Sequence, residues 1–150
     1  MNNINDLFLD SCENGDIVSI RILLANAQLD PSANEGRSFY LACEHGYVEI
    51  VKLLLLDGRF DPRQYDHLGL RRASTNGFAE IVKLILDDGR QHPASWKYES
   101  IHNACENNHV DVLSLLLKDP RTKKWKNRDK AISTARANGY IQIVELLTTF

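Results

Sequence analysis

Three cysteines and three histidines are the residues of this chain whose chemistry suits a metal ion. Thiolates and imidazoles are the usual ligands of zinc in proteins. The six residues are Cys12, Cys43, Cys105, His45, His102 and His109. No C-x-x-C pair is present, and the cysteines are far apart in the sequence. Cys12 and Cys43 are 31 positions apart, and Cys105 lies 62 positions after Cys43, which fits equivalent positions in a repeat of 31 residues. We therefore interpret the cysteines as small packing residues. We expect no metal and no other cofactor.

Motifs of known catalytic sites are missing from the sequence. It contains no G-x-S-x-G elbow, no glycine-rich phosphate loop and no H-E-x-x-H pair. The carboxylate pair Asp87-Asp88 falls at the end of an expected helix, where solvated surface is the simplest interpretation. We therefore predict that the protein is not an enzyme.

Aromatic residues in the stretches between apolar segments are candidates for binding a partner. Trp and Tyr dominate binding hot spots at protein interfaces. Two arginines and a histidine are expected on the solvent-facing side of neighbouring segments. The alternatives are that the aromatics pack locally and that the charged residues only form a solvated face. The predicted partner-binding residues are Tyr65, Trp96, Tyr98, Trp125, Arg71, Arg72 and His102.

A basic segment, residues 118–130, carries seven Lys and Arg around one Trp. Such a pattern can hold nucleic acid, inositol phosphates or an acidic peptide, or it can be a charged, solvated loop. The candidate anion-binding residues are Lys123, Lys124, Lys126 and Arg128. Residues 118–150 have eight Lys and Arg against three Asp and Glu, whereas residues 1–117 have ten against seventeen. This asymmetry favours one end of the chain for a negatively charged partner.

Five residues spaced 31 positions apart organise the chain. They are Gly15, Gly46, Gly77, Asn108 and Gly139. An even period of this order is typical of a repeat array. Apolar residues flank each of the five at helical spacing. We therefore interpret each as the left-handed residue that ends a helix, and not as part of a β-hairpin turn.

Each repeat predicts a short helix, a tight turn, a longer helix and an extended loop. The longer helices are apolar around most of their circumference, so they must be buried on several sides. A small residue four positions before each turn predicts a close approach of the two helices: Ser11, Ala42, Ala73, Ala104 and Ala135. An apolar residue seven positions before each turn predicts the main packing contact: Phe8, Phe39, Leu70, Ile101 and Ile132.

The chain resembles the ankyrin repeat on the strength of two stretches in register. They are A-C-E-H-G-Y-V-E-I-V-K-L-L-L-L-D-G and A-S-T-N-G-F-A-E-I-V-K-L-I-L-D-D-G. The period of this chain is slightly shorter than the family's usual one, which predicts shortened loop fingers. The family's T-P-L-H motif is absent. The short period and the sequence G-R-F-D-P are similar to ankyrin proteins of amoebae and of the giant viruses that infect them.

The resemblance implies an all-α solenoid of five stacked helix-turn-helix units with short loop fingers. We expect a single domain over residues 1–150, with units at about 4–37, 38–68, 69–99, 100–130 and 131–150. Ankyrin arrays are protein-binding scaffolds, so the resemblance implies a protein partner on the concave face and fingers. The alternative is nucleic acid or a phosphoinositide on residues 118–130.

Location and oligomeric state are expected from simpler features. The odd number of cysteines argues against a secreted disulfide scaffold. The first six residues lack the basic stretch of a signal peptide. We therefore expect a cytoplasmic protein, in the host cytoplasm if it is viral. We expect a monomer, with weak self-association through the C-terminal unit, where Leu146, Leu147 and Phe150 leave little polar capping.

Overall fold

The protein is helical throughout the part of the chain that the computed structural model describes, residues 3–64 and 67–149. These residues contain α-helices and short 3-10 helices and no strand, which confirms the all-α prediction. Within the same residues, no helix is both long and apolar enough to cross a bilayer. The chain folds into two compact units, Met1–Gly69 and Leu70–Phe150. The expectation of a single domain stays a prediction.

The described residues of the first unit form two helix pairs. The first pair is α1 (Ile4–Asn14) and α2 (Ile17–Leu24), and the second is α3 (Arg37–His45) and α4 (Val48–Leu56). α1 packs on α3 and α2 packs on α4, so first helices and second helices form separate layers. The short helix η1 (Asn34–Gly36) leads into α3.

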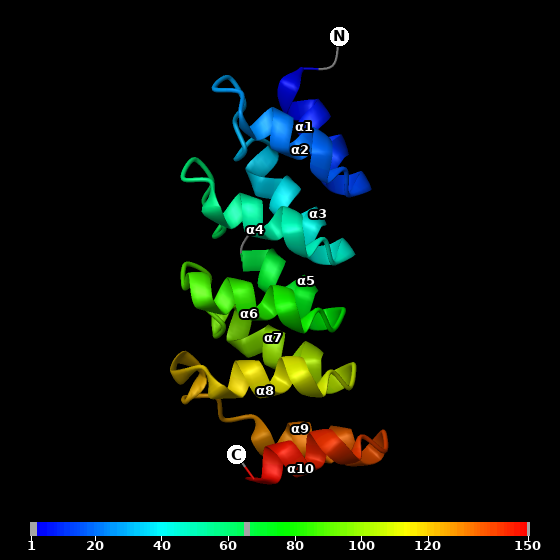
Figure 1. The fold of residues 1–150 in the computed structure, drawn as a ribbon. Helices are drawn as coiled ribbons and strands as arrows, with labels where there is room; N and C mark the ends of the chain where they lie inside the picture. Colours follow the sequence, from blue (N-terminus) through cyan, green and yellow to red (C-terminus); the bar gives the residue numbers. More distant parts are fainter. Residues whose placement is uncertain (1–2, 65–66, 150) are drawn as a thin grey trace. The chain divides into compact units, whose positions relative to one another are not determined.

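The second unit contains three helix pairs, and α5 begins at its border with the first. Its helices are α5 (Leu68–Thr75), α6 (Ala79–Asp88), α7 (Ser95–Glu106), α8 (Val110–Lys118), η3 (Pro120–Thr122), α9 (Arg128–Ala137) and α10 (Ile141–Thr149). The second helices α6, α8 and α10 pack in succession, and α7 packs on α9. Figure 1 shows that within each unit the tight turns gather at one end of the helix pairs and the longer loops at the other.

The tight turns have the predicted left-handed backbone. The residues at the five repeat positions have φ of 73°, 80°, 77°, 60° and 74°, in chain order from Gly15 to Gly139. At Gly15 the backbone N–H donates to the carbonyl of Ser11, and at Gly46 to that of Ala42. The prediction that each of these residues ends a first helix is confirmed, including Asn108 in place of glycine.

The repeat also determines the core. The small residues Ala42, Ala73, Ala104 and Ala135 are buried, so the two helices of these four pairs lie close together there. Ser11, at the same position of the first pair, is only half-buried. The predicted apolar contacts are buried in the first four helix pairs, at Phe8, Phe39, Leu70 and Ile101. Ile132, the fifth, is only half-buried, because in the described chain no further helix pair covers that side of α9.

A left-handed turn precedes α3, and an equivalent one occupies the start of α7. Asn34, Glu35 and Gly36 have φ of 57°, 60° and 79°. Trp96, Lys97 and Tyr98 have φ of 51°, 56° and 65°. The regular part of α7 therefore begins after Tyr98. The fourth finger departs from this pattern, because Asn127 has φ of −87°.

Candidate functional site

Trp96 stands on the surface of the second unit, with 57% of its area exposed. The guanidinium carbon of Arg71 lies 4.9 Å from the centre of the indole ring, in a cation–π contact. Arg71 Nη1 also donates to Glu99 Oε2 at 2.5 Å. The Arg71 side chain is only 14% exposed, so Trp96 rests on a guanidinium that a carboxylate holds in position.

The left-handed turn decides where the Trp96 side chain leaves the backbone. Three consecutive residues without glycine in this region are costly, at roughly 1–2 kcal/mol each, and such outliers cluster at functional sites. The equivalent turn at Asn34–Gly36 shows that this backbone path belongs to the repeat itself. The large, exposed aromatic side chain is particular to Trp96.

His102 links α7 to the fourth finger. Its Nε2 lies 3.4 Å from Asn127 Nδ2, and its ring meets the Trp125 ring edge-on with centroids 5.9 Å apart. Trp125 is only 8% exposed. Its expected place as an aromatic on an exposed loop is therefore wrong, because the finger turns its indole inward against His102. Whether it contributes to binding stays a prediction.

The polar residues of α7 lie on one side of the helix. Glu99, His102, Asn103 and Glu106 are three or four positions apart, which places them on a common stripe. Asn103 Nδ2 donates to Thr75 Oγ1 of α5 at 2.8 Å. A hollow of about 200 Å³ lies between α7 and α9, lined by His102, Cys105, Glu106, Asn127, Lys130, Ala131 and Thr134.

We call the surface made by these residues the first-helix face of the second unit. Its members are Arg71, Arg72, Thr75, Trp96, Glu99, His102, Asn103, Glu106, Asn127, Lys130 and Thr134. It brings together Arg71, Trp96 and His102 from the predicted set: Arg71 of α5 contacts Trp96 and Glu99 of α7, and His102 lies one helical turn after Glu99. Arg72 is exposed on α5, and Tyr98 is half-buried. Tyr65 lies outside the described residues.

Two family models match the chain. Residues 39–67 match a model described as an ankyrin repeat, and residues 70–149 match one described as three copies of ankyrin repeats. The chain belongs to the ankyrin repeat family. A comparison with curated proteins gives no match. Ankyrin repeats are generally protein–protein interaction modules, and proteins built from them are typically non-enzymatic scaffolds.

An arginine after the second helix joins successive ankyrin repeats, and the sequence reasoning missed its role. Arg121 Nη1 donates to the carbonyls of Gly89 and Gln91 at 3.1 and 3.2 Å, and its Nη2 donates to that of Leu86 at 3.2 Å. The carboxylate of Asp119 binds the same guanidinium. In the first unit, Arg59 bridges back to three carbonyls in the same way while it binds Asp57.

The recurrence of Asp-x-Arg could have revealed this contact. Arg59, Arg90 and Arg121 each follow an aspartate by two positions and recur once per repeat, whereas the first ankyrin loop has Gln28 instead. The arginine guanidinium is also the reason why the pKa values of Asp57 and Asp119 are lowered, chiefly through the side-chain hydrogen bond.

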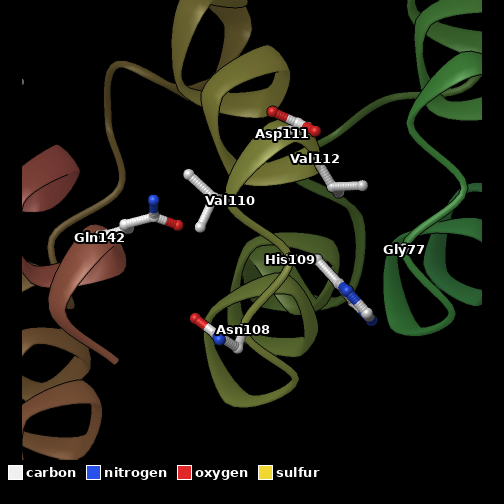
Figure 2. A pocket seen from close by; sticks show the side chains of 7 residues that line it. All are labelled: Gly77, Asn108, His109, Val110, Asp111, Val112 and Gln142. Atoms are coloured by element: carbon white, nitrogen blue, oxygen red, sulfur yellow. The ribbon is translucent and has the colours of Figure 1, made fainter. Parts of the chain in front are cut away.

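A larger hollow of the second unit, about 370 Å³, lies at the tight turns of the ankyrin repeats and is not part of the first-helix face. Figure 2 shows His109 directed toward the Gly77 turn and Gln142 of α10 on the other side. His109 Nε2 lies 2.8 Å from the carbonyl oxygen of Thr75.

An equivalent hollow in the first unit lies along Gly15, Gly46 and Tyr47, and the hydroxyl of Tyr47 donates to the carbonyl of Glu13. Tyr47 and His109 both directly follow the left-handed residue of their repeat, so their positions are equivalent. Because the hollow recurs with the repeat, we interpret it as a consequence of stacking and not as a ligand site.

The three cysteines are buried and free, as their interpretation as packing residues predicts. Burial raises the pKa of the Cys12 and Cys105 thiols to about 12 and that of Cys43 well above its ordinary value. Such thiols stay protonated near neutral pH, which makes them poor nucleophiles and poor metal ligands. Among the described residues, no three His, Cys, Asp or Glu side chains are grouped as a metal site would require.

Proposed function

We propose that this ankyrin protein is a non-enzymatic scaffold and that it binds a protein partner through the first-helix face of its second unit. Trp96 is the central contact in this proposal. The observation that supports it is the exposed indole, oriented in advance by the cation–π contact with Arg71. A rigid aromatic side chain loses little conformational entropy on binding, so it can contribute much of the free energy of association.

The residues around Trp96 take different parts in the proposal. Arg71 binds Glu99 and lies against one face of the Trp96 ring, so it positions Trp96 and does not itself contact the partner in this proposal. Arg72 and Asn103 supply charge and hydrogen-bonding groups at the rim. Tyr65 and Tyr98 stay predicted contacts. A cytoplasmic location also stays a prediction.

Local packing is the competing interpretation of Trp96. A side chain that served only to pack would cover its ring, as Trp125 does. More than half of the Trp96 surface is left to solvent. The two tryptophans therefore favour different roles, although both lie in finger sequences.

The test is affinity capture from the native cell, or from the host cell, with the full chain as bait. Baits carrying the wild-type sequence, Trp96→Ala and Ile22→Ala are compared by quantitative mass spectrometry. Ile22 is an exposed apolar residue of the first unit and is the matched control. We expect at least one protein to fall tenfold or more with Trp96→Ala and to persist with Ile22→Ala. Equal recovery on all three baits would refute the proposal.

A further inference from the structure

We infer that the fourth finger and the hollow beside it bind an acidic peptide segment. The inference rests on the proposed function in that this segment belongs to the partner that contacts Trp96. The finger reaches the first-helix face through His102, which contacts both Trp125 and Asn127. His102 and Glu99 are one helical turn apart on α7, so the finger adjoins the Trp96 cluster.

The first observation is a set of cations that form no ion pair with the described residues. Lys123, Lys124 and Lys126 are exposed, and within the described residues none of them forms an ion pair. The arginines of the loops differ, because Arg59, Arg63, Arg90 and Arg121 each bind the aspartate two positions earlier. Asp119 is occupied by Arg121, so it does not neutralise the lysines of the same finger.

The hollow supplies the second observation. Asn127, Lys130 and Thr134 bring an amide, an ammonium and a hydroxyl to its wall, beside His102. These groups can donate hydrogen bonds to carboxylates. Glu106 lines the same hollow. Its negative charge repels carboxylates from that part of the hollow, so the acidic segment must approach from the side of the lysines. An extended acidic peptide can therefore place carboxylates over the three lysines and one near Lys130.

Other polyanions fit this surface less well. Single-stranded nucleic acid binds by stacking bases on exposed aromatic rings, but Trp125, the aromatic residue within the basic segment, is buried. Residues 1–117 carry ten Lys and Arg against seventeen Asp and Glu, so a long polyanion meets repulsion outside the finger. Membrane binding is strengthened by apolar side chains that enter the interface, and among the described residues the exposed large hydrophobic side chains lie outside 118–130.

The experiment measures fluorescence anisotropy of a labelled short Glu/Gly peptide titrated with the full chain at low salt. A Gln/Gly peptide of equal length tests the need for charge. The finger variant changes Lys123, Lys124 and Lys126 to Gln. The control variant changes Lys52, Arg63 and Lys83 to Gln, so that both variants lose the same net charge. Oligothymidylate and vesicles containing a phosphoinositide are the two competing probes.

We expect the Glu peptide to bind in a salt-dependent way, the Gln peptide to bind at least tenfold more weakly, and the finger variant to lose at least tenfold in affinity. The control variant should stay within threefold of the wild type. Equal losses in the two variants, or equal binding of the two peptides, would overturn the inference. Tighter binding of oligothymidylate or vesicles through the same lysines would overturn it in favour of nucleic acid or membrane.

Trp96→Ala separates this inference from the proposed function. The Glu peptide does not contact Trp96, so its affinity for the Trp96→Ala variant should equal that for the wild type. If capture depends on Trp96 while the peptide does not bind, only the acidic-segment inference fails. If the peptide binds through the lysines while capture does not depend on Trp96, the proposed function fails.

Discussion

At the scale of single residues, the turn at Trp96, Lys97 and Tyr98 stores backbone strain. The first finger relieves part of the same strain with Gly36, which is equivalent to Tyr98. Glycine adopts positive φ about as readily as negative φ. In the third finger all three residues carry side chains, so the surrounding packing must hold the turn in place.

Replacing Lys97 by glycine should therefore raise the free energy of unfolding by about 0.5–1 kcal/mol. The gain is the relief of left-handed strain, about 1–2 kcal/mol, reduced by the larger entropy of glycine in the unfolded chain. Lys97 is exposed, so little packing is lost. The measurement is chemical denaturation of the full chain.

Lys83→Gly is the matched control, because Lys83 is exposed in the middle of the right-handed helix α6. Its unfolding free energy should fall by about 1 kcal/mol. The Lys83–Asp87 ion pair is exposed and adds little to this difference. Changes of the same sign in the two variants would contradict the strain at Lys97.

Ala73 tests the close approach of the helices in a pair. Its side chain is fully buried, so Ala73→Leu should overpack the contact and lower stability by roughly 1–3 kcal/mol. Ala137→Leu, at an exposed position of α9, should change stability by less than about 0.5 kcal/mol. A thermal melt in which Ala73→Leu matches the wild type would contradict the packing argument.

At the scale of elements, the Asp-x-Arg loops at Arg59 and Arg121 fasten α4 to α2 and α8 to α6. The guanidinium binds carbonyls at the C-terminal end of the earlier helix, where the backbone leaves acceptors unsatisfied and the helix dipole favours a positive charge. The aspartate accepts two hydrogen bonds from the guanidinium and so holds it in the orientation in which its other N–H groups reach the carbonyls. An arginine suits this place because its planar fork serves several acceptors at once, which a lysine ammonium cannot do.

Arg121→Ala should lower the free energy of unfolding by about 2 kcal/mol, because it leaves Asp119 and three carbonyls without their charged donor. Arg121→Lys should recover less than half of that loss. Arg63→Ala removes an exposed pair with Asp61 and should cost less than about 0.5 kcal/mol. Denaturation curves that give Arg121→Ala and Arg63→Ala the same cost would refute the role of the loop.

The same loop predicts an acid dependence of stability. Hydrogen bonding to Arg121 lowers the pKa of Asp119 in the folded protein, whereas the pKa of an aspartate in the unfolded chain is about 3.9. The contribution of this group is complete above that value and is lost as pH falls through the lower folded pKa. Stability measured from pH 5 down to pH 2 should fall less steeply in Arg121→Ala than in the wild type. If stability fell equally steeply with pH in Arg121→Ala and in the wild type, the contribution of the Asp119–Arg121 pair would be contradicted.

The finger elements show how far the sequence can predict. Trp96 and Trp125 both lie in finger sequences, and the sequence predicts both as contacts. Their burial differs because Trp96 sits in a left-handed turn and Trp125 precedes Asn127, whose φ is −87°. The burial of Trp125 depends on its contact with His102, which lies in the preceding helix pair. Spacing within one finger does not contain this information.

At the scale of the whole molecule, the repeat register was the most informative property of the sequence. It predicted the left-handed residues from Gly15 to Gly139 and the burial of Cys12, Cys43 and Cys105. It did not predict contacts that depend on which side chain reaches the previous repeat. The bridge from Arg121 to Leu86 joins two neighbouring repeats. The recurring Asp-x-Arg marks its donor in the sequence, but its acceptors are backbone carbonyls, which leave no pattern there.

The oligomeric state is predicted from the outer side of the last helix pair. Ile141 is 70% exposed there, beside Val144 in a mainly apolar hollow. Leu147 is buried, and Phe150 lies outside the described residues. Arg136 occupies the position that a buried Cys or Ser holds in the other four repeats, so it places a charge at this surface. A stable dimer needs about 800 Å² from each partner, which these few side chains do not offer.

We therefore expect a monomer of 17.1 kDa in sedimentation equilibrium at micromolar concentration. Weak association at higher concentration should disappear with Ile141→Lys, because a charge would then occupy the apolar hollow. A dimer mass at micromolar concentration would contradict the expectation.

Partner contact at Trp96 is tested most directly by photo-crosslinking in the cell. A photoreactive amino acid replaces Lys97, next to Trp96, in one full-length variant, and replaces Lys83 on the second helix α6 in another. Both sites are exposed lysines of the second unit. We predict a discrete crosslinked protein from position 97 that is absent from position 83 and is lost when Trp96→Ala is added. No crosslinked protein from position 97, or the same products from both positions, would contradict binding through this face.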